Sequence, residues 1–281
     1  MTVTREYREP SARRKAELDP SCYRKEQMKR IGLVVAGTLC ASAAFGDLTG
    51  FVDPFVGTAG TGHTTPAACC PFGMVQAGPD TGNEDWHHCS GYVSGDKRIF
   101  GFSQTHLNGT GCPDLGDILI LPDATSDGLE YDKSSEAAAP GWYAVTLANG
   151  ARVEVAAAEH SAIYRITYSG EGRKKLLVDC QWGMVNKDEL STRVRECDVT
   201  RDGETGLSGS MRVVRWVDRR VGFTVEFDHP CKSCTELPKR GNAPRYVFDF
   251  DLRPGELLMV KVGLAAENGG FVETALPGWG W

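Results

Sequence analysis

Residues 142–155 read WYAVTLANGARVEV, and this stretch decides the fold class. Apolar and polar residues alternate on both sides of Asn149-Gly150, which is typical of half-buried β-strands. An Asn-Gly pair tolerates the positive φ angles of a type I′ turn. The stretch therefore predicts a β-hairpin.

Further strands are predicted towards the C-terminus, at residues 162–168, 211–217, 221–227, 246–252 and 257–264. The turn Arg253-Pro254-Gly255-Glu256 joins the last two, and the pattern predicts no long helix. Many short strands with a turn every roughly ten residues are typical of a β-sandwich. We predict an all-β fold, a large antiparallel two-sheet β-sandwich.

The composition is that of an ordinary globular protein: 281 residues, 41% hydrophobic, 24% charged, with a formal net charge of -6. A net negative charge is not typical of a nucleic-acid-binding protein, so we expect no nucleic-acid partner. Outside the N-terminal region, no apolar stretch is long enough to span a membrane, so we expect no membrane span in the mature chain.

The N-terminal region resembles a secretory signal. Met28-Lys29-Arg30 precedes a short apolar stretch at 31–40 and small residues at 41–44, which predicts a signal peptide over 28–46 and a periplasmic or secreted protein. Residues 1–27 are interpreted as an extension mis-assigned upstream of a true start at Met28. Cys40 leaves a lipoprotein anchor open, although Leu39 stands where a small residue is wanted.

Ten cysteines are present, and eight of them follow the predicted signal peptide. An even number in an exported protein permits disulfides, whose pairing the sequence leaves open. Cys231-Lys232-Ser233-Cys234 has the spacing of half a zinc site but no second half. A local disulfide or two free thiols is the favoured interpretation.

Residues that could carry chemistry gather between 53 and 117. The glycine-rich segment before His63 lacks the Gly-Lys-Ser/Thr of a phosphate loop, so we interpret it as a loop that brings backbone close to a ligand. Trp86 and His87 stand together, and an aromatic ring beside hydrogen-bonding side chains is typical of a sugar site. A core tryptophan with surface histidines is the alternative. Residues 101–117 predict a structured loop that enters a buried strand at 118–121.

Other chemistries find less support. A metal site could be built from His63, His87, His88 and His106 with Asp85, Asp114 or Asp117. The spacing of a zinc-binding helix is absent, and so is the G-x-S-x-G of a serine nucleophile. The paired carboxylates of a glycosidase cannot be selected from the many Asp and Glu residues.

Four ordered stretches resemble glycoside hydrolase family 92, the calcium-dependent exo-α-mannosidases. They are FVDPFVGTAGTGHTTPAACCPFGMVQAGPDT (51–81), CSGY (89–92), GFSQTHLNGTGCPDLGDILILP (101–122) and LPGWGW (276–281). The resemblance implies an N-terminal β-sandwich, here residues 47–270, and a linker that starts at 271–281. An (α/α)6 helical domain, which this chain lacks, would follow. It also implies removal of terminal α-linked mannose from glycans with inversion, and a calcium requirement.

In this family the acid, the base and most calcium ligands belong to the helical domain. The resemblance therefore implies no catalytic residue and no metal ligand in this chain, which we expect to be inactive alone and to expose apolar surface to the helical domain. The residues implied to bind substrate are Trp86, His87, Cys89, Tyr92, His63, His106, Gly109 and Thr110. Gln104 stands where the family often has His, and 93–95 replaces a more polar run, which bears on linkage preference. The alternatives are a stand-alone carbohydrate-binding module, a purely structural fragment and an unrelated sandwich hydrolase.

Overall fold

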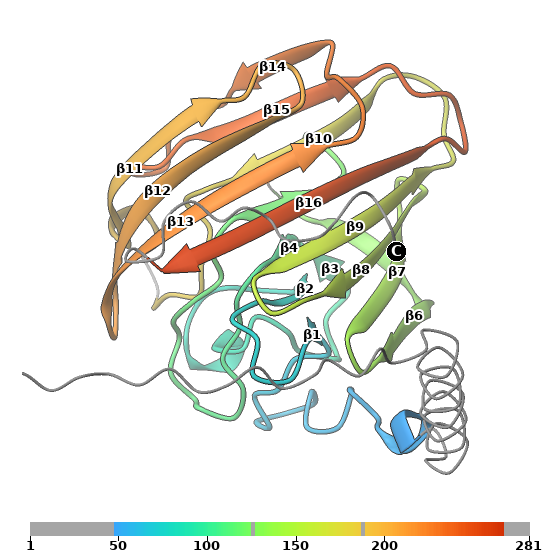
Figure 1. Ribbon diagram of the computed structural model, residues 1–281. Helices are drawn as coiled ribbons and strands as arrows, with labels where there is room; N and C mark the ends of the chain where they lie inside the picture. The colour runs from blue at the N-terminus through green and yellow to red at the C-terminus, as the bar shows by residue number, and fades with distance from the viewer. Residues whose placement is uncertain (1–47, 125–126, 187–188, 267–281) are drawn as a thin grey trace, which may run out of the picture. The chain divides into compact units, whose positions relative to one another are not determined.

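The computed structural model describes residues 48–124, 127–186 and 189–266, and its strands form two antiparallel sheets (Figure 1). In order across the smaller sheet, the seven strands are β1 (Ala68–Cys69), β2 (Gln76–Asp80), β4 (Gly101–Ser103), β5 (Leu119–Leu121), β10 (Lys174–Asp179), β15 (Arg245–Phe250) and β14 (Ser233–Glu236). In order across the larger sheet, the nine strands are β11 (Val194–Arg201), β12 (Gly206–Val214), β13 (Asp218–Phe227), β16 (Leu257–Ala266), β9 (Ser161–Tyr168), β8 (Ala151–Ala157), β7 (Trp142–Leu147), β6 (Leu129–Ala139) and β3 (Arg98–Ile99).

The helical content of the described residues is confined to three short 3-10 helices: η1 (Leu48–Phe51), η2 (Trp86–His88) and η3 (Leu190–Thr192). Within this described part, no helix is long and apolar enough to cross a membrane. The predicted all-β fold is confirmed. The predicted extension, signal peptide and linker lie outside the described residues.

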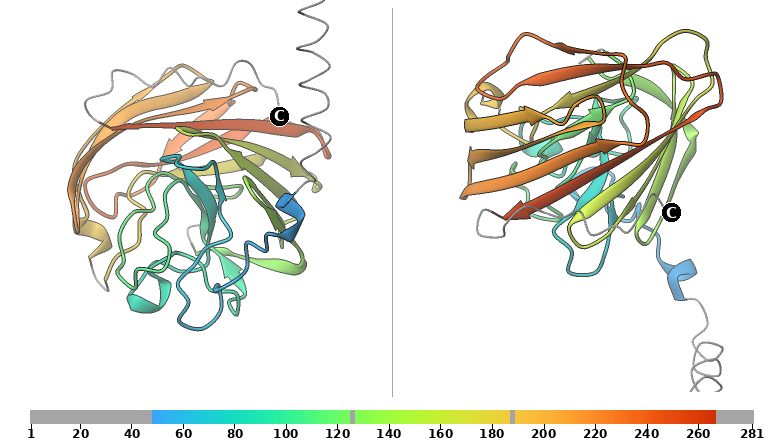
Figure 2. Two further views of the ribbon diagram at one scale, coloured as in Figure 1. Left: turned by 60° about the horizontal axis from the view of Figure 1, so that its bottom comes forward. Right: turned by 45° about the horizontal axis from the view of Figure 1, so that its top comes forward.

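One hydrophobic core joins the two sheets. Strands with alternating burial, such as β8, direct every second side chain inward, as the period of two in a strand requires. The core includes Ile120, Leu177 and Phe248 from the smaller sheet and Val153, Tyr164 and Val262 from the larger one. This is the arrangement of a β-sandwich, and Figure 2 shows how the long strands of the larger sheet curve.

The predicted hairpin is confirmed as β7 and β8, which pair from Trp142↔Ala156 to Thr146↔Arg152. Its turn differs from the expected type I′, because Gly150 has a positive φ of 81° whereas Asn149 does not. The Asn149 side chain instead accepts a hydrogen bond from the Ala151 N–H at 3.0 Å and donates one to the Pro122 carbonyl at 2.8 Å. This side-chain turn ties the hairpin to the end of β5.

One of the other predicted strands is shorter than expected, and one predicted turn joins strands of different sheets. The strand predicted at 211–217 ends at Val214, because the Trp216 N–H donates to the Asp114 carboxylate at 3.1 Å and the chain turns there. The turn at 253–256 does join β15 and β16, but these strands belong to different sheets. β16 is buried along most of its length, and it lies in the middle of the larger sheet, between β13 and β9.

The loops around the short strands β1 to β5 hold an unusual concentration of left-handed backbone. Within the described residues, the non-glycine residues at positive φ are His63, Phe72, Asp85, Leu115, Asp117 and Ile118. Such residues are uncommon in proteins and persist where surrounding contacts determine them. The polar motifs between 53 and 117 therefore form irregular, tightly held loops rather than regular elements.

All eight cysteines of the described part are free thiols in the structure. For Cys231 and Cys234 this corresponds to the second of the two interpretations that the sequence left open. Burial raises the pKa of both thiols, which favours the protonated form.

Candidate functional site

Trp86 begins the short helix η2 and is one of the few large apolar side chains on the surface, with 53% of its area exposed. The residue before it, Asp85, has φ 64° and ψ 179°, a conformation found almost solely in glycine. Two contacts with Val185 hold it there: the Asp85 N–H bonds the Val185 carbonyl at 2.9 Å, and Glu84 forms a parallel bridge to the same residue. An aspartate does not favour this backbone conformation by itself. The tertiary contacts with Val185 therefore hold the turn that leaves Trp86 exposed to solvent.

His63 and the glycine loop of 109–111 lie against Trp86. The His63 ring meets the indole edge to face, with centroids 4.4 Å apart. The Gly109 N–H donates to the His63 carbonyl at 2.6 Å, and a Cβ at Gly111 would stand 2.9 Å from the indole nitrogen. Glycine at 111 therefore permits the loop to approach the ring. The structure brings these predicted site residues together, with Gly109 and Thr110 exposed beside them.

His63 also carries an unsatisfied polar atom. Only 7% of the residue is exposed, and its Nε2 is buried with no hydrogen-bond partner. Buried polar atoms without a partner are rare in native proteins.

Cys89 and Tyr92, also predicted to bind substrate, are buried beneath this surface, with exposures of 0% and 1%. Burial raises the pKa of the Cys89 thiol, against a backbone hydrogen bond from Gly111 that lowers it. The Tyr92 hydroxyl donates to Glu136 at 2.8 Å, and burial together with that carboxylate raises its pKa. In this structure both side chains anchor the segment that follows Trp86, and a direct sugar contact stays a prediction.

His106, a further predicted site residue, is 1% exposed and forms a buried ion pair. Its Nε2 lies 2.8 Å from the Asp80 carboxylate, and its Nδ1 lies 2.7 Å from the Gln76 carbonyl. The Gln76 carbonyl and an ionised Asp80 carboxylate are both acceptors, so this arrangement favours the doubly protonated imidazolium ring. Burial opposes that charge, but Asp80 outweighs it and raises the pKa of His106.

The Asp80 pair also orders its surroundings. The second carboxylate oxygen of Asp80 accepts a hydrogen bond from the Trp182 indole N–H at 2.8 Å. A Cβ at Gly91 would stand 2.4 Å from Asp80, so the CSGY segment passes directly over the pair. His106 therefore supports the site from below.

Asp114 and Asp117, considered above as metal ligands, bind cationic side chains instead. Asp117 lies 2.7 Å from Arg193 and 3.0 Å from Arg219, and Asp114 lies 3.6 Å from Arg219. Burial alone would raise the pKa of Asp117, but the two guanidinium groups lower it to about 2. Among the described residues, no group of three or more His, Cys, Asp or Glu side chains could hold a metal ion. These residues do not fit a calcium site.

Gln104, the residue that departs from the family motif, is fully buried. Its amide nitrogen donates to the Tyr164 hydroxyl at 2.8 Å and to the Ile118 carbonyl at 3.0 Å. The side chain thus belongs to the interior between the sheets and lies away from Trp86's exposed face.

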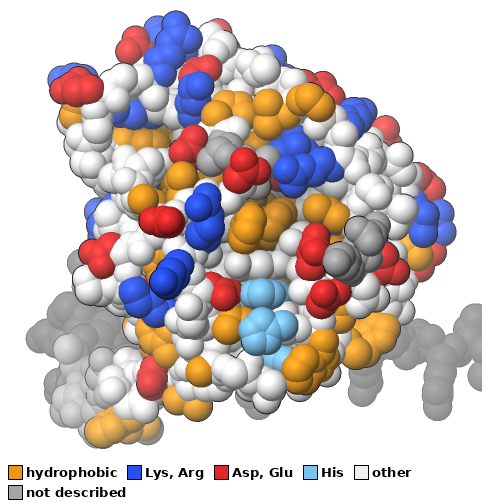
Figure 3. All heavy atoms as spheres, turned by 180° about the vertical axis from the view of Figure 1, so that it is seen from behind, with side chains coloured by type: hydrophobic (Ala, Val, Ile, Leu, Met, Phe, Trp, Pro, Cys, Tyr) orange, Lys and Arg blue, Asp and Glu red, His pale blue; other side chains and the backbone are white. Residues whose placement is uncertain are grey.

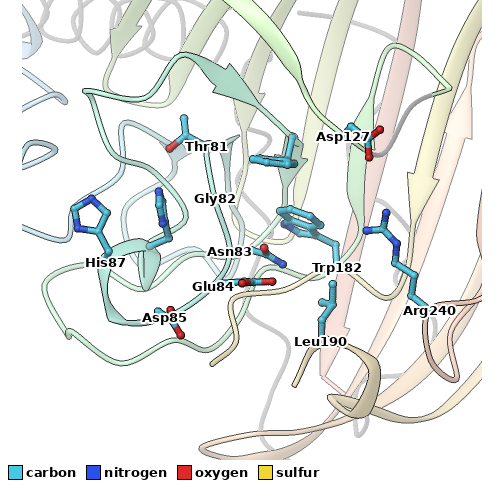
Figure 4. A pocket seen from close by; sticks show the side chains of 12 residues that line it. Thr81, Gly82, Asn83, Glu84, Asp85, His87, Asp127, Trp182, Leu190 and Arg240 are labelled. Atoms are coloured by element: carbon cyan, nitrogen blue, oxygen red, sulfur yellow. The ribbon is translucent and has the colours of Figure 1, made fainter. Parts of the chain in front are cut away.

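His87 points to a different place from Trp86. It lines a pocket whose wall does not include Trp86, and Figure 4 shows it with Glu84, Trp182 and Arg240 around the same hollow. The His87 and His88 rings lie edge to face at 5.0 Å, and Figure 3 shows histidine side chains gathered beside hydrophobic ones on one face. Sequence motifs gave no signal for Trp182 or Arg240, because both lie far along the chain from η2.

Comparisons with known proteins agree with this architecture. The family described as "Glycosyl hydrolase family 92 N-terminal domain" matches residues 51–265. The structure is similar to the family GH92 α-mannosidase BT3965 from Bacteroides thetaiotaomicron, with 28% identity, a TM-score of 0.71, and coverage of 79% of this chain and 33% of that one. The GH92 inverting mannosidase BT2199 from Bacteroides thetaiotaomicron VPI-5482 shares the fold, with 20% identity, a TM-score of 0.65, and coverage of 76% and 31%.

A curated relative is named as a glycosidase. A protein of Arthroderma benhamiae named as an uncharacterized secreted glycosidase is 32% identical over 178 residues, which is 53% of this chain and 23% of that protein. The chain thus spans about a quarter to a third of the length of these relatives. The family match covers most of the described residues and includes every residue of the candidate site. The chain therefore belongs to the N-terminal domain family of glycosyl hydrolase family 92.

Proposed function

We propose that this domain contacts the glycan in an exported, inverting exo-α-mannosidase that removes terminal α-linked mannose. The observation that carries the proposal is the exposed Trp86 ring, held beside His63 within a domain of this family. An exposed indole can cover the apolar face of a sugar ring, while neighbouring polar groups bond its hydroxyls.

Catalysis in this proposal requires a second domain. An inverting glycosidase needs a carboxylic acid to protonate the leaving oxygen and a carboxylate to activate water on the opposite face. We assign neither role to a described residue, since the buried aspartates of the cluster are bound to His106, Arg193 and Arg219. The acid, the base and the calcium ligands would belong to a helical domain that corresponds to the rest of the matched mannosidases.

Exposed apolar side chains support such a partner domain. Beyond Trp86, the exposed large hydrophobic residues include Phe51, Phe72, Trp216 and Val217, with exposed fractions between 61% and 108%. Solvent-exposed side chains of this size are unfavourable in an isolated domain and common at interfaces. Export agrees with the secreted glycosidase from Arthroderma benhamiae.

The test is α-mannosidase activity of the full chain, with calcium and with a chelator, alone and mixed with a separately expressed helical domain of a family member. We expect activity only in the mixture with calcium, and loss of most of it when Trp86 is replaced by alanine. Activity of the chain alone would place the acid and base within it and overturn the proposal.

A stand-alone carbohydrate-binding module is the second candidate, because the same exposed Trp86 could bind sugar without a partner. Affinity for mannosides that the helical domain does not change, without activity in any mixture, would favour it.

A further inference from the structure

A second hollow lies beside η2 and has His87 and His88 of that helix in its wall. Its volume is about 640 Å³, within the range of ligand-binding pockets. Trp86 is not part of its wall, although the next residue, His87, is. The hollow thus shares the short helix η2 with Trp86 but is lined by other residues, and Figure 4 shows His87 in its wall.

The apolar part of the wall is a fixed pair of rings. Phe100 and Trp182 stack with centroids 5.8 Å apart and an interplanar angle of 25°. The Trp182 indole N–H is bonded to Asp80 at 2.8 Å, and the Phe100 N–H donates to the Asp80 carbonyl at 2.7 Å. The Trp182 ring is therefore fixed by the Asp80 carboxylate, and the Phe100 backbone is fixed by the Asp80 carbonyl, so this part of the wall loses little entropy when a ligand binds.

The polar part of the wall comes from exposed side chains on both sides of those rings. Figure 4 shows Asn83 and Glu84 on one side of Trp182, and Asp127 and Arg240 on the other. Each carboxylate has about four acceptor positions, so it can accept a hydrogen bond from a ligand in addition to bonds within the protein. Arg240 adds donors in a planar fork.

This chemistry selects among ligand classes. Three carboxylates, Glu84, Asp85 and Asp127, line the pocket with a single guanidinium, which disfavours a phosphate or another anion. The ring pair disfavours a bare metal ion, which would require oxygen ligands all around it. A neutral ligand with an apolar face and many hydroxyls can pack against the two aromatic rings and hydrogen-bond the polar side chains of the wall. A sugar ring is such a ligand.

We propose that this pocket is a second saccharide subsite, which holds an inner sugar unit of the same glycan whose outer units lie at Trp86. The inference rests on the proposed function, because it takes the glycan from there. Asp85, the strained residue between the two surfaces, sets their relative position through its bond to Val185. The pocket then makes the domain prefer glycans longer than a disaccharide.

The test compares ligands of increasing length by titration calorimetry on the full chain: methyl α-mannoside, α-linked mannobiose and a branched mannose-rich oligosaccharide. The pocket variants are Glu84→Gln and Arg240→Gln. The matched controls are Glu130→Gln, exposed on β6, and Arg253→Gln, whose side chain is 87% exposed in the turn before β16. Circular dichroism and thermal unfolding verify that each variant is folded.

We expect the oligosaccharide to bind more tightly than mannobiose, and each pocket variant to weaken oligosaccharide binding about tenfold, the effect of one lost hydrogen bond to a charged group. Binding of methyl α-mannoside should stay unchanged in those variants, and the control variants should behave as the original chain. Trp86→Ala should weaken all three ligands.

Equal affinity for mannobiose and the oligosaccharide, or pocket variants without effect while Trp86→Ala abolishes binding, would overturn the subsite and leave the proposed function intact. Absence of binding for every ligand, with and without the helical domain, would overturn both.

Discussion

Replacing Asp80 by asparagine tests the buried ion pair under the candidate site. The carboxylate accepts one hydrogen bond from the His106 imidazolium and one from the Trp182 indole, both at 2.8 Å. The asparagine oxygen can accept only one of them well, and the imidazolium then has no counter-charge. Breaking a buried pair in this way costs about 3–5 kcal/mol, a large share of the roughly 5–15 kcal/mol that stabilises a typical domain.

The loss of stability in Asp80→Asn depends on pH, because the ion pair requires a protonated His106. Because the folded-state pKa of His106 is raised above the unfolded value of about 6.5, the pair contributes its full stability below that value and loses it as the pH rises through the folded pKa. Above the folded pKa, a neutral His106 can accept a hydrogen bond from the asparagine NH2 through Nε2, while the asparagine oxygen still accepts from Trp182. Asp80→Asn should therefore be strongly destabilising at pH 6 and much less so in alkaline solution.

Urea unfolding at several pH values measures the difference, and nitrogen NMR of the His106 ring reports directly whether both nitrogens carry protons. The matched control is Asp251→Asn, since the Asp251 side chain is 80% exposed and its ion pair with Lys232 is long, at 3.8 Å. We expect a change below about 1 kcal/mol for it. A pH-independent loss in Asp80→Asn, or a neutral His106 ring at pH 6, would refute the reasoning.

Three further predictions concern neighbouring residues. The pKa of Asp117, about 2 in the folded state, lies below the unfolded value. Ionised Asp117 therefore contributes about 2 kcal/mol to the free energy of unfolding at neutral pH, and this contribution is lost as the pH falls from about 4 to 2. In Asp117→Asn, stability measured by acid unfolding should not show this pH-dependent loss. Gly91→Ala should lower the free energy of unfolding, measured with urea, by about 3 kcal/mol, because Gly91 has φ 80° and a Cβ there would lie 2.4 Å from Asp80. The control Gly95→Ala places its Cβ in open space and should change that free energy by less than about 0.5 kcal/mol. Trp86→Ala should leave thermal unfolding nearly unchanged, because the side chain is half exposed, yet weaken mannoside binding about tenfold or more by calorimetry.

The alternation of apolar and polar residues predicted strands correctly where one face of the strand is buried. The alternation in 142–155 identified β7 and β8, and 162–168 and 221–227 lie within β9 and β13. The same rule missed β6, whose polar residues pair with β7 on either side of a register shift between Asp132 and Ala137. A bulge of this kind breaks the period of two, so alternation no longer reports the strand.

The turn at 253–256 and the end of β12 show a second limit. Alternation marks a strand but does not say which sheet it joins: β15 and β16 follow each other through this turn and yet lie in different sheets. The strand predicted to continue through Trp216 ended early because Asp114, about a hundred residues away, bonds the turn. The alternation of residues within a segment does not indicate such a long-range partner.

The sequence by itself determined the all-β class, the principal strands and the segment between 53 and 117 that carries the site, because burial on one face of a strand imposes a period of two and the family motifs are contiguous. Only the tertiary structure decided which site residues face solvent: Trp86 does, whereas Cys89, Tyr92 and His106 lie beneath it. It also brought Trp182 and Arg240 to the pocket beside η2. The physical reason is that exposure and ion pairing depend on contacts between loops from distant parts of the chain, and these contacts hold even the strained backbone at Asp85.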